Sequence, residues 1–347
     1  MKRRERILTA LSIGVPDRPP ISFGVGPNAE DTNVGEVYRY FGARDKNDLY
    51  AVAGIDGFNV WAWNAVMGRY AGESKKTSDG TALDFWGNYD QKFFGLGDCD
   101  TVKKLEKHNW PDIKDFDFSH IYEKAKEIRA KDMAVAAGHL GVGFQMHVML
   151  RGYERAFFDL AEEKYVQCLV ERVSEFTASY IEELLKAGNG LIDVVRADED
   201  MGNMDRMLLN PNLWRRLYKT AWQRVFQVVH KYGAKIWFHS CGCIMPVLDD
   251  LIETGIDCWN PFPPNVAGNE HLSLKSWRKG KIALDGGVSH PVLVSGTPDD
   301  VKRETQKVLD TFAPDGGLLI GPAQVFTSDI PPENIISFFK TALSYKG

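Results

Sequence analysis

A short apolar run that ends in a histidine and two thiols is the part of the sequence best suited to chemistry. Residues 235–243 read KIWFHSCGC, and the run IWF is rich in strand-forming types. Residues two apart on a strand point the same way, so His239 and Cys241 should project together. Histidine and cysteine are both preferred zinc ligands. A closed structural zinc site needs four protein ligands, so a metal held by this pair would occupy an open, catalytic site that takes further ligands from other strands. The alternative is a core histidine beside two small buried thiols.

The composition limits the classes of function. The chain has 347 residues, of which 44% are apolar and 26% are charged, as is typical of a soluble globular protein. The formal net charge of -5 argues against nucleic acid or an anionic membrane as the main partner. The apolar runs fall far short of the ~20 residues that cross a membrane. Five cysteines without the spacing of a disulfide framework indicate a reducing, cytoplasmic compartment, and we expect Cys243 and Cys258 to be structural.

Strands and helices alternate along the chain. Eight short apolar runs predict strands near residues 22, 60, 136, 193, 237, 258, 283 and 319, with helical patterns between them. This order predicts one domain over residues 1–347, an α/β fold of the TIM (β/α)8 barrel type. A doubly wound open sheet is less favoured because no GxGxxG motif follows the first strand. Residues 211–230 are predicted to form one helix with Asn210 as its N-cap.

Residues 68–97 interrupt this alternation. They mix glycine, aspartate, threonine and aromatic residues without a helical period, and Asp79 with Gly80 is a turn signal. The segment therefore predicts a β-hairpin insertion after the second strand. Such insertions commonly form a lid or a binding loop, and a purely structural hairpin is the alternative.

Polar side chains follow almost every predicted strand. In a TIM barrel the active site lies where the strands end, at the C-terminal face. The residues at those positions are Asn64, His139, Asp198, Glu199, Asp200, His239, Cys241, Asn260, Asp285 and Gln324. Each alone has an ordinary explanation, such as a helix cap or a turn, but together on one rim they predict a functional site.

Several longer segments resemble the uroporphyrinogen decarboxylase superfamily. They are DGTxxDFWG, LRGYERAFFDL, DEDMG, FHSCG, DLIETGIDxxNP, DGGV, GTPDDV, GGLLIGP and PPENI. The resemblance covers nearly the whole chain and implies a TIM barrel, in agreement with the strand count. Decarboxylases of this superfamily open with an arginine-bearing segment that receives the substrate carboxylates, whereas the corresponding start here reads RPPISFGVGPN. A lyase of the uroporphyrinogen decarboxylase type is therefore not favoured.

The sequence also resembles the corrinoid-linked methyltransferases of this superfamily, which carry zinc on an HxC motif and a distant cysteine. This chain keeps His239 and Cys241, but its late segment reads IGPAQV, with Gln324 and no cysteine. The missing ligand weakens the interpretation as an enzyme that methylates a thiol of the coenzyme M type. A non-catalytic barrel that binds a corrinoid or tetrapyrrole is a further alternative.

The resemblance is best matched by the methyl-donor component of an acetogen-type O-demethylase system. Such an enzyme moves a methyl group from a small donor, here a methyl ether that could be aromatic, to the cobalt of a separate corrinoid protein. A methylated amine is an alternative donor. The leaving oxygen must be neutralised by a Lewis acid or a proton donor. The candidate zinc ligands are His239, Cys241 and Glu199, and the candidate catalytic residues are Glu199, Asp200 and His239.

Further residues are expected around this site. The candidate binding residues are Trp61, Trp63, Asn64, Phe144, His147, Asn260, Asp285 and Gln324. Arg151 is expected to pair with Glu154 or Asp159 on the surface. We expect the protein to be a monomer or a homodimer.

Overall fold

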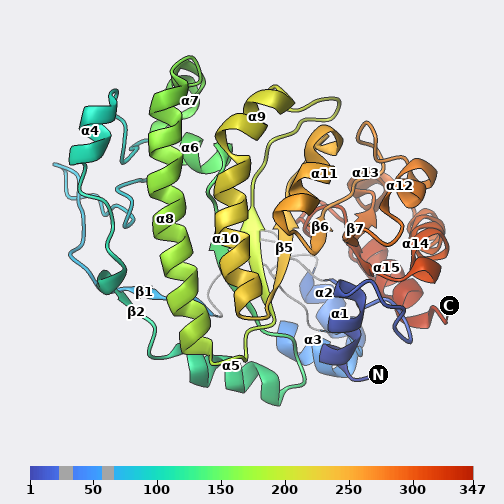
Figure 1. Cartoon of the computed structure of the whole chain (residues 1–347). Coiled ribbons are helices and arrows are strands. Elements are labelled where there is room, and N and C mark those ends of the chain that lie inside the picture. The colour runs from blue at the N-terminus through green and yellow to red at the C-terminus, as the bar shows by residue number, and fades with distance from the viewer. Residues whose placement is uncertain (23–33, 57–65, 347) are drawn as a thin grey trace.

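A six-stranded parallel sheet forms the centre of the molecule. The computed structural model describes residues 1–22, 34–56 and 66–346 of the chain (Figure 1). The strands, in their order across the sheet, are β3 (Ala136–Leu140), β4 (Val194–Asp198), β5 (Lys235–His239), β6 (Cys258–Asn260), β7 (Ala283–Val288) and β8 (Leu318–Pro322). Each strand lies parallel to the next one in the chain. Repeated strand–helix units produce this order.

Six of the eight predicted strands are present in the described residues, and no closed barrel is seen there. Beside the edge strand β8, Ile21 forms a parallel bridge with Ile320, in the region predicted as the first strand. Beside the other edge strand, Gly138 N donates a hydrogen bond to Val66 O at 3.3 Å. The predicted second strand, near residue 60, lies outside the described residues. Both edges of the sheet are therefore extended by further segments, as a barrel requires.

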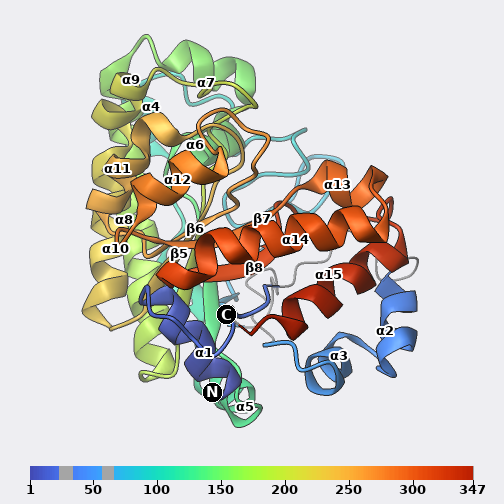
Figure 2. The same ribbon diagram turned by 90° about the vertical axis from the view of Figure 1, so that its right-hand side faces the viewer.

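Most of the helices connect the strands and pack on the outer side of the sheet. The longer helices are α5 (Ile121–Ala130), α8 (Glu163–Gly188), α10 (Lys219–Lys231), α11 (Met245–Thr254), α14 (Pro298–Phe312) and α15 (Pro332–Ser344). The shorter helices are α1 (Arg3–Leu11), α2 (Gly35–Phe41), α3 (Lys46–Val52), α4 (Val102–Lys107), α6 (Phe144–Arg151), α7 (Tyr153–Asp159), α9 (Pro211–Leu217), α12 (His271–Arg278) and α13 (His290–Ser295). Figures 1 and 2 show α10 beside β5, and α14 beside β7 and β8. None of the described helices has the length and apolar character needed to cross a membrane.

Two helix predictions need correction. Residues 211–230 form two helices, α9 and α10, because Tyr218 leaves the helical conformation with φ -121° and ψ -27°. Helix α6 was not predicted, although it follows β3 directly. Most of its residues are buried, so it lacks the one-sided apolar pattern by which a surface helix is recognised.

Alternate residues of each strand face opposite sides of the sheet. On β5, Ile236 and Phe238 face the helices, and the Phe238 ring packs edge-on against Trp222 with centroids 5.4 Å apart. Trp237 belongs to a separate apolar cluster formed by α1 and the inner face of the strands. Its main members are Ile7, Ala10, Leu11, Val194, Trp237, Cys258, Ala283 and Leu319. Helix α1 thus closes the N-terminal end of the inner face, opposite α7 and α9 (Figures 1 and 2).

Two residues farther along the same face, the buried side chains are polar. They are Arg196 on β4, His239 on β5, Asn260 on β6 and Asp285 on β7. The change from apolar to polar side chains separates a structural end, covered by α1, from the C-terminal end, where parallel α/β sheets carry their sites.

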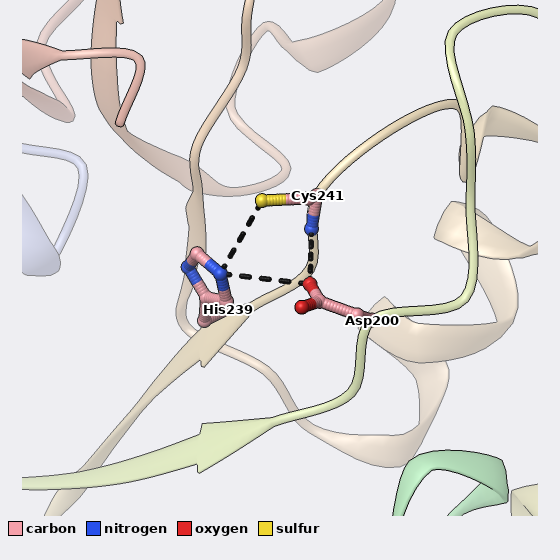
Figure 3. Close-up of side chains that lie close together, drawn as sticks. All are labelled: Asp200, His239 and Cys241. Carbon is pink, nitrogen blue, oxygen red and sulfur yellow. Dashed lines mark hydrogen bonds and ion pairs between the residues drawn. The ribbon is translucent and has the colours of Figure 1, made fainter. Parts of the chain in front are cut away.

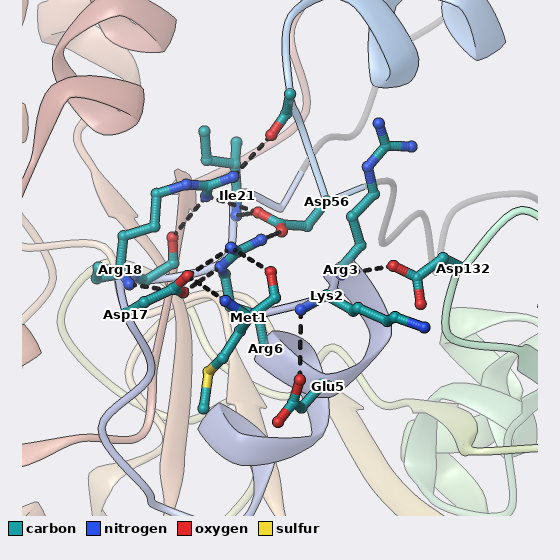
Figure 4. A network of polar contacts seen from close by, with 12 residues as sticks. Met1, Lys2, Arg3, Glu5, Arg6, Asp17, Arg18, Ile21, Asp56 and Asp132 are labelled. Carbon is teal, nitrogen blue, oxygen red and sulfur yellow. Dashed lines mark hydrogen bonds and ion pairs between the residues drawn. The ribbon is translucent and has the colours of Figure 1, made fainter.

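A buried ion network attaches α1 to the edge of the sheet (Figure 4). The Asp56 carboxylate is fully buried and accepts hydrogen bonds from Arg6, from Arg18 Nη1 at 2.7 Å and from Ile21 N at 3.0 Å. Asp17 also accepts from Arg6, although its side chain is 42% exposed. Hydrogen bonding to Arg6 holds the pKa of Asp17 well below its ordinary value. The network fixes α1 against the residues that extend the sheet beside β8.

The segment predicted as a hairpin insertion packs beside α8. Strand β1 (Arg69–Tyr70) pairs antiparallel with β2 (Phe116–Asp117). Within the segment, the structure shows two isolated antiparallel bridges, Lys76 with Ala82 and Tyr89 with Phe93. Thr77 N also donates a hydrogen bond to Thr81 O at 3.0 Å across the predicted turn at Asp79 and Gly80, so the pairing there is short and the hairpin insertion stays a prediction. Tyr180 Oη on α8 accepts a hydrogen bond from Gly68 N at 2.8 Å and so fixes the start of the segment.

We predict that Asp56→Ala lowers the free energy of unfolding by about 3–5 kcal/mol, because two guanidinium groups lose a buried partner. Asp17→Ala should cost about 1 kcal/mol or less, because water reaches that carboxylate and Arg6 keeps Asp56 as its partner. Urea unfolding followed by circular dichroism measures both values. Equal losses in the two variants would show that burial of Asp56 does not determine the strength of the network.

Candidate metal centre

The ends of β4 and β5 bring three metal-ligand side chains together (Figure 3). The two strands pair with Asp198 opposite His239, so the residues that follow each strand also lie side by side. His239 Nε2 is 3.5 Å from Cys241 Sγ and 3.6 Å from Asp200 Oδ1. Asp200 Oδ1 also accepts a hydrogen bond from Cys241 N at 2.8 Å. One nitrogen, one sulfur and one oxygen atom of this cluster lie within 4.8 Å of one another.

The imidazole of His239 is oriented by groups behind the cluster. Nδ1 lies 2.8 Å from Asn260 Oδ1, and Asn260 Nδ2 donates to the carbonyl oxygen of Asp285 at 3.2 Å. The amide of Asn260 is therefore fixed with its oxygen toward Nδ1, so Nδ1 carries the proton and Nε2 presents its lone pair to the cluster. The ring also lies nearly parallel to Trp237, with centroids 6.0 Å apart. His239 is held in the tautomer that can bind a metal through Nε2.

The electrostatics of the cluster favour a cation. Burial and the nearby Asp200 carboxylate raise the pKa of Cys241 to about 12, so the thiol alone keeps its proton at neutral pH. A divalent metal would reverse this state, because a coordinated thiol loses its proton. Imidazole, thiolate and carboxylate are all zinc ligands, and three of them leave a fourth position open, as in catalytic zinc sites. The residues present therefore fit zinc.

Glu199 does not join this cluster, and its predicted place as zinc ligand or catalytic acid needs correction. Side chains alternate at the end of β4, so Asp198 and Asp200 face inward and Glu199 faces the helices. Its carboxylate accepts hydrogen bonds from Phe144 N at 2.6 Å and from Trp222 Nε1. It is fully buried, and burial raises its pKa to about 7. Glu199 thus connects β4 to α6 and α10, and Asp200 is the carboxylate beside the histidine and the thiol.

A second set of buried polar groups lies behind the cluster. Asp285 Oδ2 accepts hydrogen bonds from Trp237 Nε1 at 2.7 Å and from Ser22 Oγ at 3.1 Å. Burial raises the pKa of Asp285 to about 7. On β4, Arg196 Nη2 and Asp198 Oδ1 form an ion pair at 2.6 Å. Among the predicted binding residues, Asn260 contacts His239 directly, and Asp285 holds Asn260 through its backbone.

His147 and Arg151 belong to a buried network on α6 and not to the cluster. His147 is fully buried, with Nδ1 2.9 Å from Tyr218 Oη and Nε2 3.1 Å from Asp159 Oδ2. Arg151 pairs with Asp159, as predicted, but it is 3% exposed and so lies in the interior instead of on the surface. It also donates to the carbonyl oxygens of residues 96–97 at 2.6 and 3.1 Å. The network therefore anchors the end of the insertion segment.

The remaining predicted residues fall into two groups. Gln324 and Cys241 both line a cavity of about 350 Å³, together with His290, which the sequence did not single out. Phe144 is buried in the core, where its ring packs on Phe157 with centroids 5.2 Å apart. The other predicted residues, Trp61, Trp63 and Asn64, lie outside the described residues, as does the side chain of His139.

A second cavity, of about 280 Å³, adjoins the cluster through Gln145. Its walls come from α6, α8, β2 and residues 67–86. Gln145 lines the cavity and also accepts a hydrogen bond from Asp200 N at 3.1 Å through Oε1. The sequence prediction missed Gln145, because α6 itself was not predicted. The aromatic residues of the insertion segment were the available signal for this cavity.

Comparison with known proteins identifies a family. The family model described as uroporphyrinogen decarboxylase (URO-D) matches residues 97–345 of the chain. The matched region contains β3 to β8 and all three residues of the cluster. No curated protein matches the chain.

We predict that Asp159→Ala lowers the free energy of unfolding by about 3–5 kcal/mol at pH 7, because the buried Arg151 loses its charged partner. Glu154→Ala removes an exposed carboxylate from the same helix and should change stability by no more than about 0.5 kcal/mol. Urea unfolding measures both, and a similar loss in the two variants would contradict a buried anchor.

The comparison of wild type with Asp159→Ala also gives a test by pH. Although burial opposes it, hydrogen bonds from His147 and Arg151 hold the pKa of Asp159 below its ordinary value of 3.8. Its contribution is therefore complete above pH 3.8 and is lost as the pH falls through the lower folded value. The stability difference between wild type and Asp159→Ala should accordingly shrink only in strong acid.

Proposed function

The chain belongs to the uroporphyrinogen decarboxylase (URO-D) family, a family of TIM barrels, and we propose that it is a corrinoid-dependent methyltransferase within that family. In this proposal it moves a methyl group from a small methyl ether to the cobalt of a separate corrinoid protein. The observation that supports the proposal best is the open set of metal ligands, Asp200, His239 and Cys241, at the C-terminal end of the sheet.

The chemistry of ether demethylation matches such a set of ligands. The reduced cobalt of a corrinoid is a strong nucleophile, so the methyl carbon needs little activation, whereas an alkoxide or phenoxide is a poor leaving group. A zinc ion held by Asp200 Oδ1, His239 Nε2 and Cys241 Sγ would supply a Lewis acid for that oxygen. The chain itself contributes orientation, because Asn260 fixes the ring of His239.

The exposure of the cluster supports the partner in this proposal. The Asp200 side chain is 48% exposed, whereas that of His239 is 10% exposed, so the carboxylate marks the open side of the site. The leaving oxygen can take up its final proton from water on that side. A corrinoid protein that docks at the C-terminal end of the sheet would present its cobalt to the methyl carbon on the side opposite the departing oxygen.

Methyl transfer to a thiol has weaker support. The enzymes of this kind that the sequence resembles hold zinc with a second cysteine, and here the late segment supplies Gln324. Its amide lines the same cavity as Cys241, but an amide is not among the usual zinc ligands. The third ligand in this chain is instead a carboxylate, and an oxygen-bearing methyl donor suits the site better.

We predict about one zinc per chain in the purified protein, and loss of this metal in His239→Ala and in Cys241→Ser. Glu199→Gln should keep the metal, because Glu199 faces the helices, and Cys168→Ser on α8 is the matched control for a lost thiol. Elemental analysis measures the zinc content. Zinc absent from wild type, or retained in His239→Ala, would remove the proposed mechanism.

A variant of Asn260 tests the orientation of His239 separately from metal binding by the three candidate ligands. Asn260→Ala leaves all three ligands in place but frees the His239 ring, so the zinc affinity should fall about 10- to 100-fold. Competition with a chromogenic chelator measures the affinity. The transfer itself is followed by the spectrum of methylcobalamin when a methyl ether and cob(I)alamin are mixed with the protein, and His239→Ala should abolish it.

A further inference from the structure

A third cavity, of about 480 Å³, is lined by residues of the ranges 75–95 and 108–109. No residue of the candidate metal centre lines it. Its polar lining residues include Lys75, Ser78, His108 and Asn109. We propose that this cavity binds a small organic monocarboxylate with an apolar body. The inference goes beyond the proposed function and does not depend on it, because the cavity is separate from the candidate metal centre.

The charge that lines the cavity favours an anion. Lys75 is its one charged lining residue, because no carboxylate and no other lysine or arginine lines it in the described part of the chain. The side chain of Lys75 is half-buried, and Nζ donates a hydrogen bond to Phe85 O at 3.0 Å but forms no ion pair with any described residue. By contrast, Lys104 on α4 pairs with Asp100 at 2.8 Å. A half-buried ammonium group without a counter-ion is stabilised when an anion binds beside it.

The carboxylates near Lys75 in the chain are bound to other groups. Asp79 accepts hydrogen bonds from Thr77 Oγ1 and, at 3.2 Å, from Thr81 N. Asp84 accepts a hydrogen bond from Asn88 N at 2.7 Å. Neither carboxylate serves as the counter-ion of Lys75, so the positive charge remains available to a ligand.

His108 supplies a second hydrogen-bond donor. Burial, together with the nearby charge of Lys75, lowers the pKa of His108 below its ordinary value of 6.5, so the ring is neutral at pH 7. Burial also raises the pKa of Cys99, so this thiol keeps its proton and can donate it to His108 Nδ1, which lies 3.8 Å from Sγ. Nε2 then carries the ring proton, and it makes no hydrogen bond among the described residues. Lys75 Nζ and His108 Nε2 can therefore each donate to one oxygen of a carboxylate.

The single positive charge matches a monoanion. A carboxylate carries one negative charge at neutral pH and has two acceptor oxygens. A phosphate group carries roughly −1.5 to −2 charges at that pH, and its second charge would find no cationic partner among the lining residues. A carboxylate therefore suits Lys75 and a neutral His108 better than a phosphate does.

The rest of the lining is apolar. The larger apolar lining residues are Leu83, Trp86, Phe93 and Phe94. Trp86 is 9% exposed, whereas Phe93 is 42% exposed, so the cavity has a dry wall and an open rim. Apolar surface that a ligand buries against these side chains contributes about 25 cal/mol per Å². Because acetate would bury almost none, we expect a ligand with several carbon atoms.

The walls of the cavity are preformed. Leu83 N donates to Lys75 O at 2.9 Å, and Gly95 N donates to Asn88 Oδ1 at 2.8 Å. A Cβ on Gly95 would lie 1.9 Å from Trp86 O, so only glycine allows the two chain segments to pack this closely. A ligand therefore orders few protein groups when it binds, and little of its binding energy is lost in that ordering.

The test uses hexanoate as the probe and the full-length protein, by titration calorimetry. We expect saturable binding to wild type, and binding at least about tenfold weaker in Lys75→Met, because the carboxylate loses its cationic partner. Lys76→Met, a matched change of the next residue, which is exposed and does not line the cavity, should leave the affinity unchanged. Thermal unfolding of both variants confirms that each is folded. No saturable binding to wild type, or equal affinity in Lys75→Met, would overturn the proposal.

Further ligands and variants test the chemistry of the site. Hexanamide, which lacks the charge, and acetate, which lacks the apolar body, should each bind at least about tenfold more weakly than hexanoate. His108→Leu should weaken the binding of hexanoate about tenfold, because one hydrogen bond to a charged acceptor is lost. Tighter binding of hexanamide or of inorganic phosphate than of hexanoate would also overturn the proposal. His239→Ala should bind hexanoate as wild type does, so a negative result here is distinguishable from failure of the proposed function.

Discussion

The parallel pairing of β4 with β5 is the interaction on which the site depends. Asp198 lies opposite His239 in this pair, and the chain continues on both strands for two more residues before it turns away. Asp200 and Cys241 therefore emerge side by side, and a backbone hydrogen bond from Cys241 N to Asp200 Oδ1 locks them together. A shift of β4 by one residue against β5 would turn Asp200 to the opposite face and separate it from His239 and Cys241.

Trp237 connects this site to the stability of the fold. Its indole lies in the apolar cluster that α1 closes, its Nε1 donates to the buried Asp285, and its ring lies parallel to His239. Burying a carboxylate such as Asp285 is costly unless donors satisfy it, and Trp237 and Ser22 supply them. The same inner face therefore changes from a packed core to the polar candidate site within a few residues.

The strand positions and the pair His239 and Cys241 could be predicted, because buried parallel strands are short apolar runs and a spacing of two places side chains on one face. The choice between Glu199 and Asp200 could not be predicted, because the sequence does not show where β4 ends and its side chains stop alternating between the two faces. His147 was misplaced for a related reason. It lies on α6, whose nearly complete burial removes the periodic pattern by which a helix is recognised.

The second cavity, beside Gln145, could not be predicted from the sequence, because the residues that form its walls are distant in the chain. Residues 67–86 meet α8 only through tertiary contacts such as the bond between Tyr180 and Gly68. The insertion segment was predicted to be a lid or a binding loop, which stays a prediction, and its place as a fixed wall of the cavity follows from the anchors at both ends. A prediction from local patterns has no access to those anchors, because each joins residues more than fifty positions apart.

The third side chain of the candidate metal centre, Asp200, is a carboxylate, and this would affect the reactivity of a bound metal. A carboxylate is a harder ligand than a thiolate and donates less electron density to a metal. A zinc ion bound by imidazole, thiolate and carboxylate would therefore remain a stronger Lewis acid than one bound by two thiolates. Stronger Lewis acidity matters most where a poor oxygen leaving group must depart, and less where a thiol merely has to lose its proton. In the function we propose, Gln324 in place of a late cysteine, together with the position of Asp200, would therefore suit the cleavage of an oxygen–methyl bond.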